Sequence, residues 1–346
     1  MALVLPWLIV SFSTLVHQRY HRLLAYLSLC LLVFIVVSVP LGGDFNSIIE
    51  RGEFELSRYD ISENEDYILL LVAYFSSLIG LETPQGYSVL IILILLRLSR
   101  LFGITFLILN LIFFSYLGIT GYHRNYLSLL FLVWGFFGRN PFLIIVAIFT
   151  HKAVILYLSV LIFSMFFRDH LCTQYKVKNN LFKFLFILIL ILSVSYILTI
   201  NYKFLGPVSH YFEHYVYYES DRAQGAVFRN LSFLVCLIFF YYFNKKQEKI
   251  NLSNRSLLNQ RKTIELAIFL STLIGLVFMI QDHTVATERV TLFSFLLLSL
   301  LSSELYNKKQ NNLKLFLIVS PFIILNIVWL FISDKAYFLW GGALFY

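Results

Sequence analysis

Long runs of apolar residues separated by short polar segments dominate the chain. The longest runs cover residues 23–41, 101–120, 153–167, 181–200, 264–280, 290–303 and 313–332. Each run reaches or approaches the length of about 20 residues that an α-helix needs to cross a bilayer. Shorter apolar runs at 2–16, 67–81, 87–96, 126–137 and 142–149 predict tilted spans, broken helices or re-entrant pieces. The pattern therefore predicts an all-α, polytopic integral membrane protein with about ten to twelve transmembrane helices.

Composition supports this class and excludes a soluble globular enzyme. Apolar residues make up 59% of the 346 residues and charged residues only 13%. The mean hydropathy is +0.79, well above the range of soluble domains. We therefore expect residues 1–346 to form a single polytopic membrane domain.

The net charge of +8 is distributed as a topological signal. Basic residues gather in the segments 17–22, 168–183, 244–262 and 304–314, which the positive-inside rule assigns to the cytoplasm. The loops at about 43–66, 201–229 and 281–289 hold most of the acidic residues and are predicted to face outward. The basic charge suits anionic membrane lipids, and no nucleic-acid partner is predicted.

Charged and imidazole groups interrupt the hydrophobic stretch 122–167, namely Arg124, Arg139, His151 and Lys152. An ionisable side chain at bilayer depth costs about 2.5–3.5 kcal/mol on insertion scales, so these residues indicate a polar site within the membrane.

Two topologies are open for this stretch. If 87–120 forms one long tilted passage, followed by a short hairpin of 126–137 and 142–149, then Arg124 and His151 face outward and Arg139 marks the inner turn. If Arg97 and Arg100 mark an outer turn instead, Arg124 moves to the inner side.

The three outward loops supply further candidates. Asp44 and Glu65 flank the first loop at the membrane surface, although a solvated loop is the simpler interpretation. The second loop is rich in aromatic residues, which fits either an interfacial belt or carbohydrate binding by stacked rings. The candidates for sugar binding are Tyr211, His214, Tyr217 and Tyr218 of this loop and Asp282 of the third loop. The other candidate site residues of these two loops are Arg222, Arg229, His283 and Arg289.

No metal site is predicted from these residues. The His210 and His214 pair is a weak metal signal, because the glutamate placement of zinc-binding helices is missing. No acidic cluster suited to a divalent cation is apparent, so we expect chemistry without metal or cofactor.

The order of these features resembles the EpsG-like and Wzy-type polysaccharide polymerases of bacterial envelopes. The resemblance rests on an outward loop with acids at both ends, an arginine before an apolar run, the helix start FTHKAVIL at residues 149–156, and ERVTLF at residues 288–293. The matching residues by position are Asp44, Glu65, Arg124, His151 and Arg289.

The resemblance implies a glycosyltransferase of the bacterial inner membrane with its active face outward and a GT-C-like arrangement of broken or re-entrant helices. Its substrates would be oligosaccharide repeat units on undecaprenyl pyrophosphate, which it would join into O-antigen, capsule or exopolysaccharide. A chain-length regulator is a possible partner, beside membrane lipids.

Roles follow from the chemistry of that reaction. Arg124, Arg289, Arg222 and Arg229 are expected to bind pyrophosphate, because guanidinium pairs bidentately with phosphate oxygens. His151, Asp44, Glu65 and His283 are the expected catalytic residues, with Asp282 a further choice for the base. Two purely structural interpretations stay open. His151 could be a histidine of the core, and Arg289 could form a salt bridge to Glu288 or Asp282.

Other functions fit the same polytopic pattern. The closest alternative is a polytopic glycosyltransferase that uses a polyprenyl-phosphate-sugar donor, since it needs the same arginines and an outward base. A flippase or other transporter of lipid-linked glycans would require polar residues through the membrane and inverted repeats, which are not evident. A membrane-bound acyltransferase or a purely structural subunit fits less well.

Overall fold

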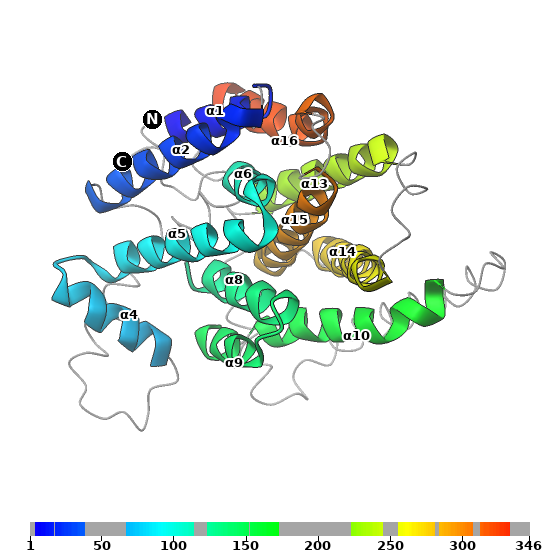
Figure 1. Cartoon of the computed structure of the whole chain (residues 1–346), viewed down its shortest axis with the longest axis horizontal. Coiled ribbons are helices and arrows are strands. Elements are labelled where there is room, and N and C mark those ends of the chain that lie inside the picture. The colour runs from blue at the N-terminus through cyan, green and yellow to red at the C-terminus, as the bar shows by residue number, and fades with distance from the viewer. Residues whose placement is uncertain are drawn as a thin grey trace. The chain divides into compact units, whose positions relative to one another are not determined.

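The computed structural model describes residues 4–16, 18–38, 67–113, 123–151, 153–172, 223–244, 255–280, 284–306 and 312–332. These residues are helical with short turns, and no strand lies among them. The helices are α1 (Val4–Ser13), α2 (Gln18–Ser38), α4 (Tyr67–Leu78), α5 (Thr83–Phe102), α6 (Ile104–Phe113), α8 (His123–Phe137), α9 (Pro141–Thr150), α10 (Val154–Cys172), α13 (Ala223–Asn244), α14 (Arg255–Ile280), α15 (Thr284–Tyr306) and α16 (Asn312–Ile332) (Figure 1). The all-α prediction is confirmed for this part of the chain.

Among the residues that the structure describes, four helices are long and apolar enough to cross a membrane. Their candidate spans are Arg19–Ser38, Thr83–Phe102, Gln260–Met279 and Ala286–Ser303, and shorter apolar helices accompany them. The helix predicted over 181–200 lies outside the described residues.

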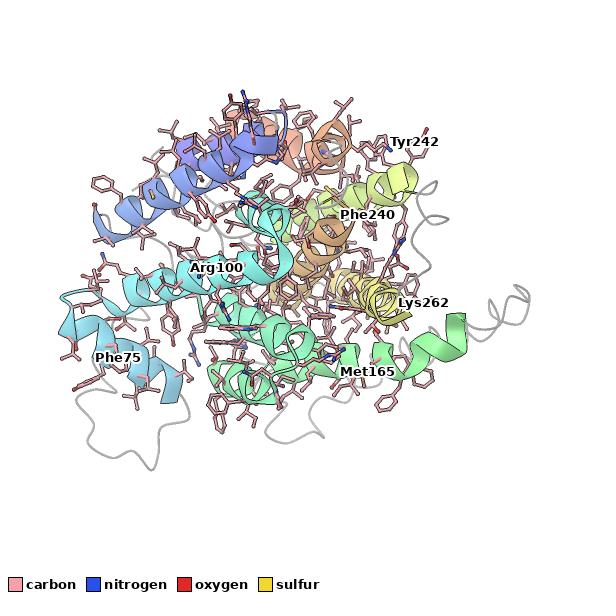
Figure 2. All side chains as sticks on the ribbon, viewed as in Figure 1. Phe75, Arg100, Met165, Phe240, Tyr242 and Lys262 are labelled. Atoms are coloured by element: carbon pink, nitrogen blue, oxygen red, sulfur yellow. The ribbon has the colours of Figure 1, made fainter. Side chains whose placement is uncertain are left out.

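Large apolar side chains cover the outer surface of several helices. Phe34 of α2 is 71% exposed and Tyr242 of α13 is 75% exposed. Figure 2 shows Phe75 of α4 and Tyr242 projecting away from their helices. Water disfavours apolar surface of this extent, whereas hydrocarbon does not. The helices are thus compatible with a helical membrane protein.

The chain divides into two compact units. The first unit comprises Met1–Leu158, Leu234–Lys245 and Leu298–Tyr346, and the second comprises Ser159–Phe233 and Lys246–Leu297. The single membrane domain expected from the sequence stays a prediction.

Gly103 breaks the continuous passage over 87–120 that one of the two open topologies requires. α5 starts with a capping box between Glu82 and Gln85 and ends at Gly103, whose φ of 94° is a conformation that favours glycine. The chain then starts α6, which packs against α5. The continuous passage is therefore wrong, because the glycine redirects the backbone after Phe102.

The predicted hairpin over 126–137 and 142–149 is confirmed as α8 and α9. Arg139 occupies the turn with a φ of 59°, and Asn140 caps α9 by accepting a hydrogen bond from the Phe142 amide at 3.2 Å. Gly135 permits close packing, because a Cβ there would lie 2.7 Å from the Ile144 side chain.

Contacts along the first unit fix the direction of its helices. The ring of Tyr87 lies 6.4 Å from that of His123, and Arg97 lies 5.9 Å from the ring of Trp134. α5 and α8 therefore run parallel. The side chain of Asn110, late in α6, accepts a hydrogen bond from Tyr126, early in α8. α6, which follows α5 in the chain, therefore runs antiparallel to both α5 and α8.

The first unit consequently has two chemically different ends. At one end, Arg97 and Arg100 finish α5 and Arg139 follows α8; we call this the Arg139 end. At the other end α5 and α8 start, α2 finishes with the Val37 carbonyl bonded to Gln85 at 3.2 Å, and α9 returns from its turn. We call this the Arg124 end.

In the second unit, the first parts of α13 and α15 pack against α14 through small and aromatic side chains. The hydroxyls of Ser271 and Ser294 lie 2.8 Å apart, and the rings of Phe233 and Phe295 meet edge to face at 4.9 Å. α14 and α15 form an antiparallel pair, with the end of α14 beside the start of α15.

Two loop boundaries from the sequence need correction. α13 starts at Ala223, inside the loop predicted for 201–229, and no span was predicted over its length. α15 starts at Thr284, inside the turn predicted for 281–289. The segments AQGAVFR and TVATER therefore form the first turns of the apolar helices that follow them, although they contain glycine, valine and threonine, which favour helix weakly.

Candidate functional site

Three predicted site residues have described side chains: Arg124, His151 and Arg289. Arg229 is placed on α13 through its backbone alone. The remaining predicted residues lie outside the described part of the chain; they are Asp44, Glu65, Tyr211, His214, Tyr217, Tyr218, Arg222, Asp282 and His283.

Arg124 lies in a polar cluster at the Arg124 end of the first unit. We define this α8 cluster as Tyr87 of α5 with His123, Arg124 and Asn125 of α8. Tyr87, His123 and Asn125 are exposed by only 0%, 1% and 2%. Arg124 is half-buried, and its Nε is shielded from solvent. Three consecutive polar residues of α8 and one tyrosine of α5 thus gather in the interior of the first unit.

A second pair anchors the α8 cluster to the core. The Tyr126 hydroxyl donates to Oδ1 of Asn110 at 3.1 Å, and Asn110 Nδ2 donates to the Phe106 carbonyl at 2.8 Å. Both side chains are buried. This pair ties the first turn of α8 to α6 and fixes how Arg124 and its neighbours are presented.

The start of α8 favours anions on physical grounds. The first turn of an α-helix carries a partial positive charge, and its backbone N–H groups point outward along the axis. Arg124 adds a full positive charge on that same turn. In a low-dielectric setting these charges act strongly on an anionic ligand.

His151 lies at the break between α9 and α10 and is half-buried. Its backbone is extended, its amide donates to Ala147 O at 3.1 Å, and its Nδ1 accepts from the Ala153 amide at 3.2 Å. A neutral imidazole has one donor and one acceptor nitrogen, so Nε2 carries the hydrogen in this arrangement. The ring is arranged to donate at Nε2, and its predicted role as a base requires it to give up the bond to Ala153.

α9 and α10 bring His151 to the Arg124 end. α8 runs from the Arg124 end to the turn at Arg139, and α9 returns in the opposite direction. Arg124 and His151, the predicted functional residues of the first unit whose side chains the structure describes, therefore lie at the same end, and Arg139 lies at the other.

Arg289 belongs to a polar cluster of the second unit. We define this α15 cluster as Asn230 of α13 with Thr287, Glu288 and Arg289 of α15. Glu288 and Thr287 are each 1% exposed and Asn230 is 2% exposed, while Arg289 is half-buried. Asn230 Nδ2 lies 3.8 Å from the Met279 sulfur, near the end of α14. The cluster therefore lies where α13 and α15 start and α14 ends.

Sequence reasoning missed several members of both clusters as site residues. Asn230 of the α15 cluster was not singled out, nor was Asn110, which anchors the α8 cluster and interrupts the apolar run ILNLIF. His123 and Asn125 flank the arginine that was predicted. Glu288 was considered only as a salt-bridge partner, and its burial depends on packing that the sequence does not display.

Each cluster can bind a polar or anionic group against apolar surroundings, and their convergence on one ligand stays a prediction. Within the described residues, no group of three or more histidine, cysteine or acidic residues is placed to hold a metal ion. Comparison of the chain with protein-family models, with curated proteins and with solved structures gave no match.

Proposed function

We propose that this protein is a metal-independent polysaccharide polymerase of the bacterial inner membrane. It joins oligosaccharide repeat units carried on undecaprenyl pyrophosphate at the outer face. We further propose ten to twelve transmembrane helices in a GT-C-like arrangement. The breaks at Gly103 and His151 support the broken helices of that arrangement.

One observation carries the proposal. Arg124, in its buried polar cluster, lies at the same end of the first unit as His151 and at the opposite end from Arg97, Arg100 and Arg139. Under the positive-inside rule the three grouped arginines face the cytoplasm. Arg124 and His151 then face outward, where the lipid-linked glycans are assembled.

The reaction assigns these groups distinct tasks. The acceptor hydroxyl oxygen attacks the anomeric carbon of the donor glycan and loses its proton to a base. The bond from that carbon to the pyrophosphate oxygen breaks, and undecaprenyl pyrophosphate leaves with the electron pair. Arg124 stabilises the negative charge of the leaving group, which a preorganised cation does most effectively where water is excluded.

The lipid-linked glycans of a deletion strain test this proposal. Accumulation of complete single repeat units on the carrier lipid, with loss of long polysaccharide, is the expected result. Incomplete repeat units would overturn it in favour of a glycosyltransferase with a polyprenyl-phosphate-sugar donor. Complete units retained on the cytoplasmic face would overturn it in favour of a flippase.

A further inference from the structure

Asn125 of the α8 cluster has a buried side-chain amide whose environment a diphosphate alone does not explain. Its side chain is 2% exposed, and neither Oδ1 nor Nδ2 has a hydrogen-bond partner in the structure. Leaving a buried polar group unsatisfied costs about 1–3 kcal/mol. Nearly all such groups in proteins are bonded, so an exception indicates an ordered water or a ligand.

The two unsatisfied atoms restrict the chemistry of that ligand. Nδ2 donates hydrogen bonds, whereas Oδ1 only accepts them. A diphosphate offers acceptors alone, so it would satisfy Nδ2 and be repelled by Oδ1. A pair of neighbouring sugar hydroxyls offers both, because one hydroxyl accepts from Nδ2 while the other donates to Oδ1.

The position of Asn125 relates this ligand to Arg124. The two residues are consecutive in the first turn of α8, where the helix start and the guanidinium favour an anion. Consecutive side chains on a helix diverge, so a ligand that contacts both must extend beyond the anionic group that Arg124 binds. A sugar attached to a diphosphate provides an anionic group for Arg124 and a hydroxyl pair for Asn125.

We propose that Asn125 is a specificity-determining residue that binds hydroxyl groups of the sugar attached directly to the diphosphate. This inference rests on the proposed function and names the part of the substrate that the α8 cluster distinguishes. Tyr87, whose ring lies beside that of His123, closes the α5 side of the cluster.

Binding to two probes tests the inference with the full chain in nanodiscs. The probes are geranylgeranyl diphosphate and geranylgeranyl diphosphoglucose, and the variants are Asn125→Leu, which removes both polar atoms at similar size, and Asn125→Gln, which retains the amide. We expect the wild type to bind the glucose probe about 10-fold more tightly than the bare diphosphate, as two added hydrogen bonds allow. Asn125→Leu should reduce the ratio of the two affinities to about one, and Asn125→Gln should retain part of the preference.

The outcomes separate the inference from the proposed function. A glucose preference that persists in Asn125→Leu, or that is missing in the wild type while the diphosphate still binds, overturns the inference and assigns an ordered water to the amide. Wild-type protein that binds neither probe overturns the proposed function and the inference with it. Thermal unfolding of each variant in the same nanodiscs confirms that the chain is folded.

Discussion

The Tyr126 hydroxyl donates a hydrogen bond of 3.1 Å to Oδ1 of Asn110 inside the first unit. This bond joins α6 to the first turn of α8, the turn that carries Arg124. Both residues are buried, so the bond is shielded from water. It is a structural link whose loss affects stability and the placement of the α8 cluster together.

Replacing Tyr126 by Phe tests this link. The variant removes the donor and leaves Oδ1 of Asn110 without this bond, which should lower the free energy of unfolding by about 1–3 kcal/mol. The apparent Tm in detergent measures the effect. Combining Tyr126→Phe with Asn110→Leu should recover part of the loss, since both partners are then apolar. A single variant as stable as the wild type would contradict the importance of the bond.

Alanine substitutions at two helical glycines, Gly135 and Gly275, are expected to have opposite effects on stability. A Cβ at Gly135 would lie 2.7 Å from the Ile144 side chain and 2.9 Å from its backbone nitrogen, so Gly135→Ala should separate α8 from α9 and reduce the apparent Tm. A Cβ at Gly275 would meet Val290 at 3.7 Å, an ordinary contact. Gly275→Ala should leave stability unchanged or raise it by about 0.5–1 kcal/mol, because alanine favours helix. Equal effects at both positions would refute the close packing of α8 and α9.

Cysteine labelling tests the orientation of the first unit. In a variant without native cysteines, Arg100→Cys lies at the Arg139 end and Glu82→Cys at the Arg124 end, and both native side chains are exposed. A membrane-impermeant maleimide applied to spheroplasts should label Glu82→Cys and should reach Arg100→Cys only after the membrane is opened. The reverse pattern would place Arg124 and His151 on the cytoplasmic side.

Arginine variants at the two ends separate function from fold. Arg124→Ala and Arg289→Ala should each abolish long polysaccharide while the protein remains in the membrane, and Arg→Lys should rescue only in part because lysine lacks the planar fork. Arg100→Ala is the matched control, since Arg100 is exposed at the Arg139 end. Polysaccharide length is read from gels of envelope extracts. Normal length in both alanine variants would remove these arginines from the proposed site.

His151 can be tested without disturbing the helix break. An asparagine side chain can also accept a hydrogen bond from an amide two residues later, so His151→Asn should preserve the bond to Ala153 and remove the imidazole. We expect this variant to fold like the wild type and to lose polymerisation, and His151→Gln to lose it as well. Normal polysaccharide from His151→Asn would assign His151 a purely structural role at the break.

Periodicity and composition were sufficient for the helical class and for most helices. The hairpin of α8 and α9 followed from apolar runs that flank Gly138, Arg139 and Asn140, because turn residues and a following proline are local signals. The whole of α13 was missed: its apolar part, FLVCLIFFYYF at residues 233–243, was not counted as a span, and its start, AQGAVFR, was assigned to the preceding loop.

The candidate site residues were predicted less completely than the helices, because hydropathy reveals charged residues but not which polar residues are buried. Arg124, His151 and Arg289 are recognisable because any charged or imidazole group in an apolar run carries a large transfer cost. Asn125 and Asn110 look alike in sequence, yet one amide is bonded and the other is not. That difference arises from neighbours on other helices.

The sequence by itself determined that the chain is helical and that it suits a membrane. It also determined that a few charged residues lie in apolar runs, where their transfer into a membrane costs free energy. These properties depend only on local hydropathy and helix period. Only the tertiary structure decided that Gly103 redirects the chain, that α5 and α8 run parallel, and that Arg124 and His151 lie at one end of the first unit with Arg139 at the other. These relationships depend on contacts between residues distant in the chain, which local pattern does not encode.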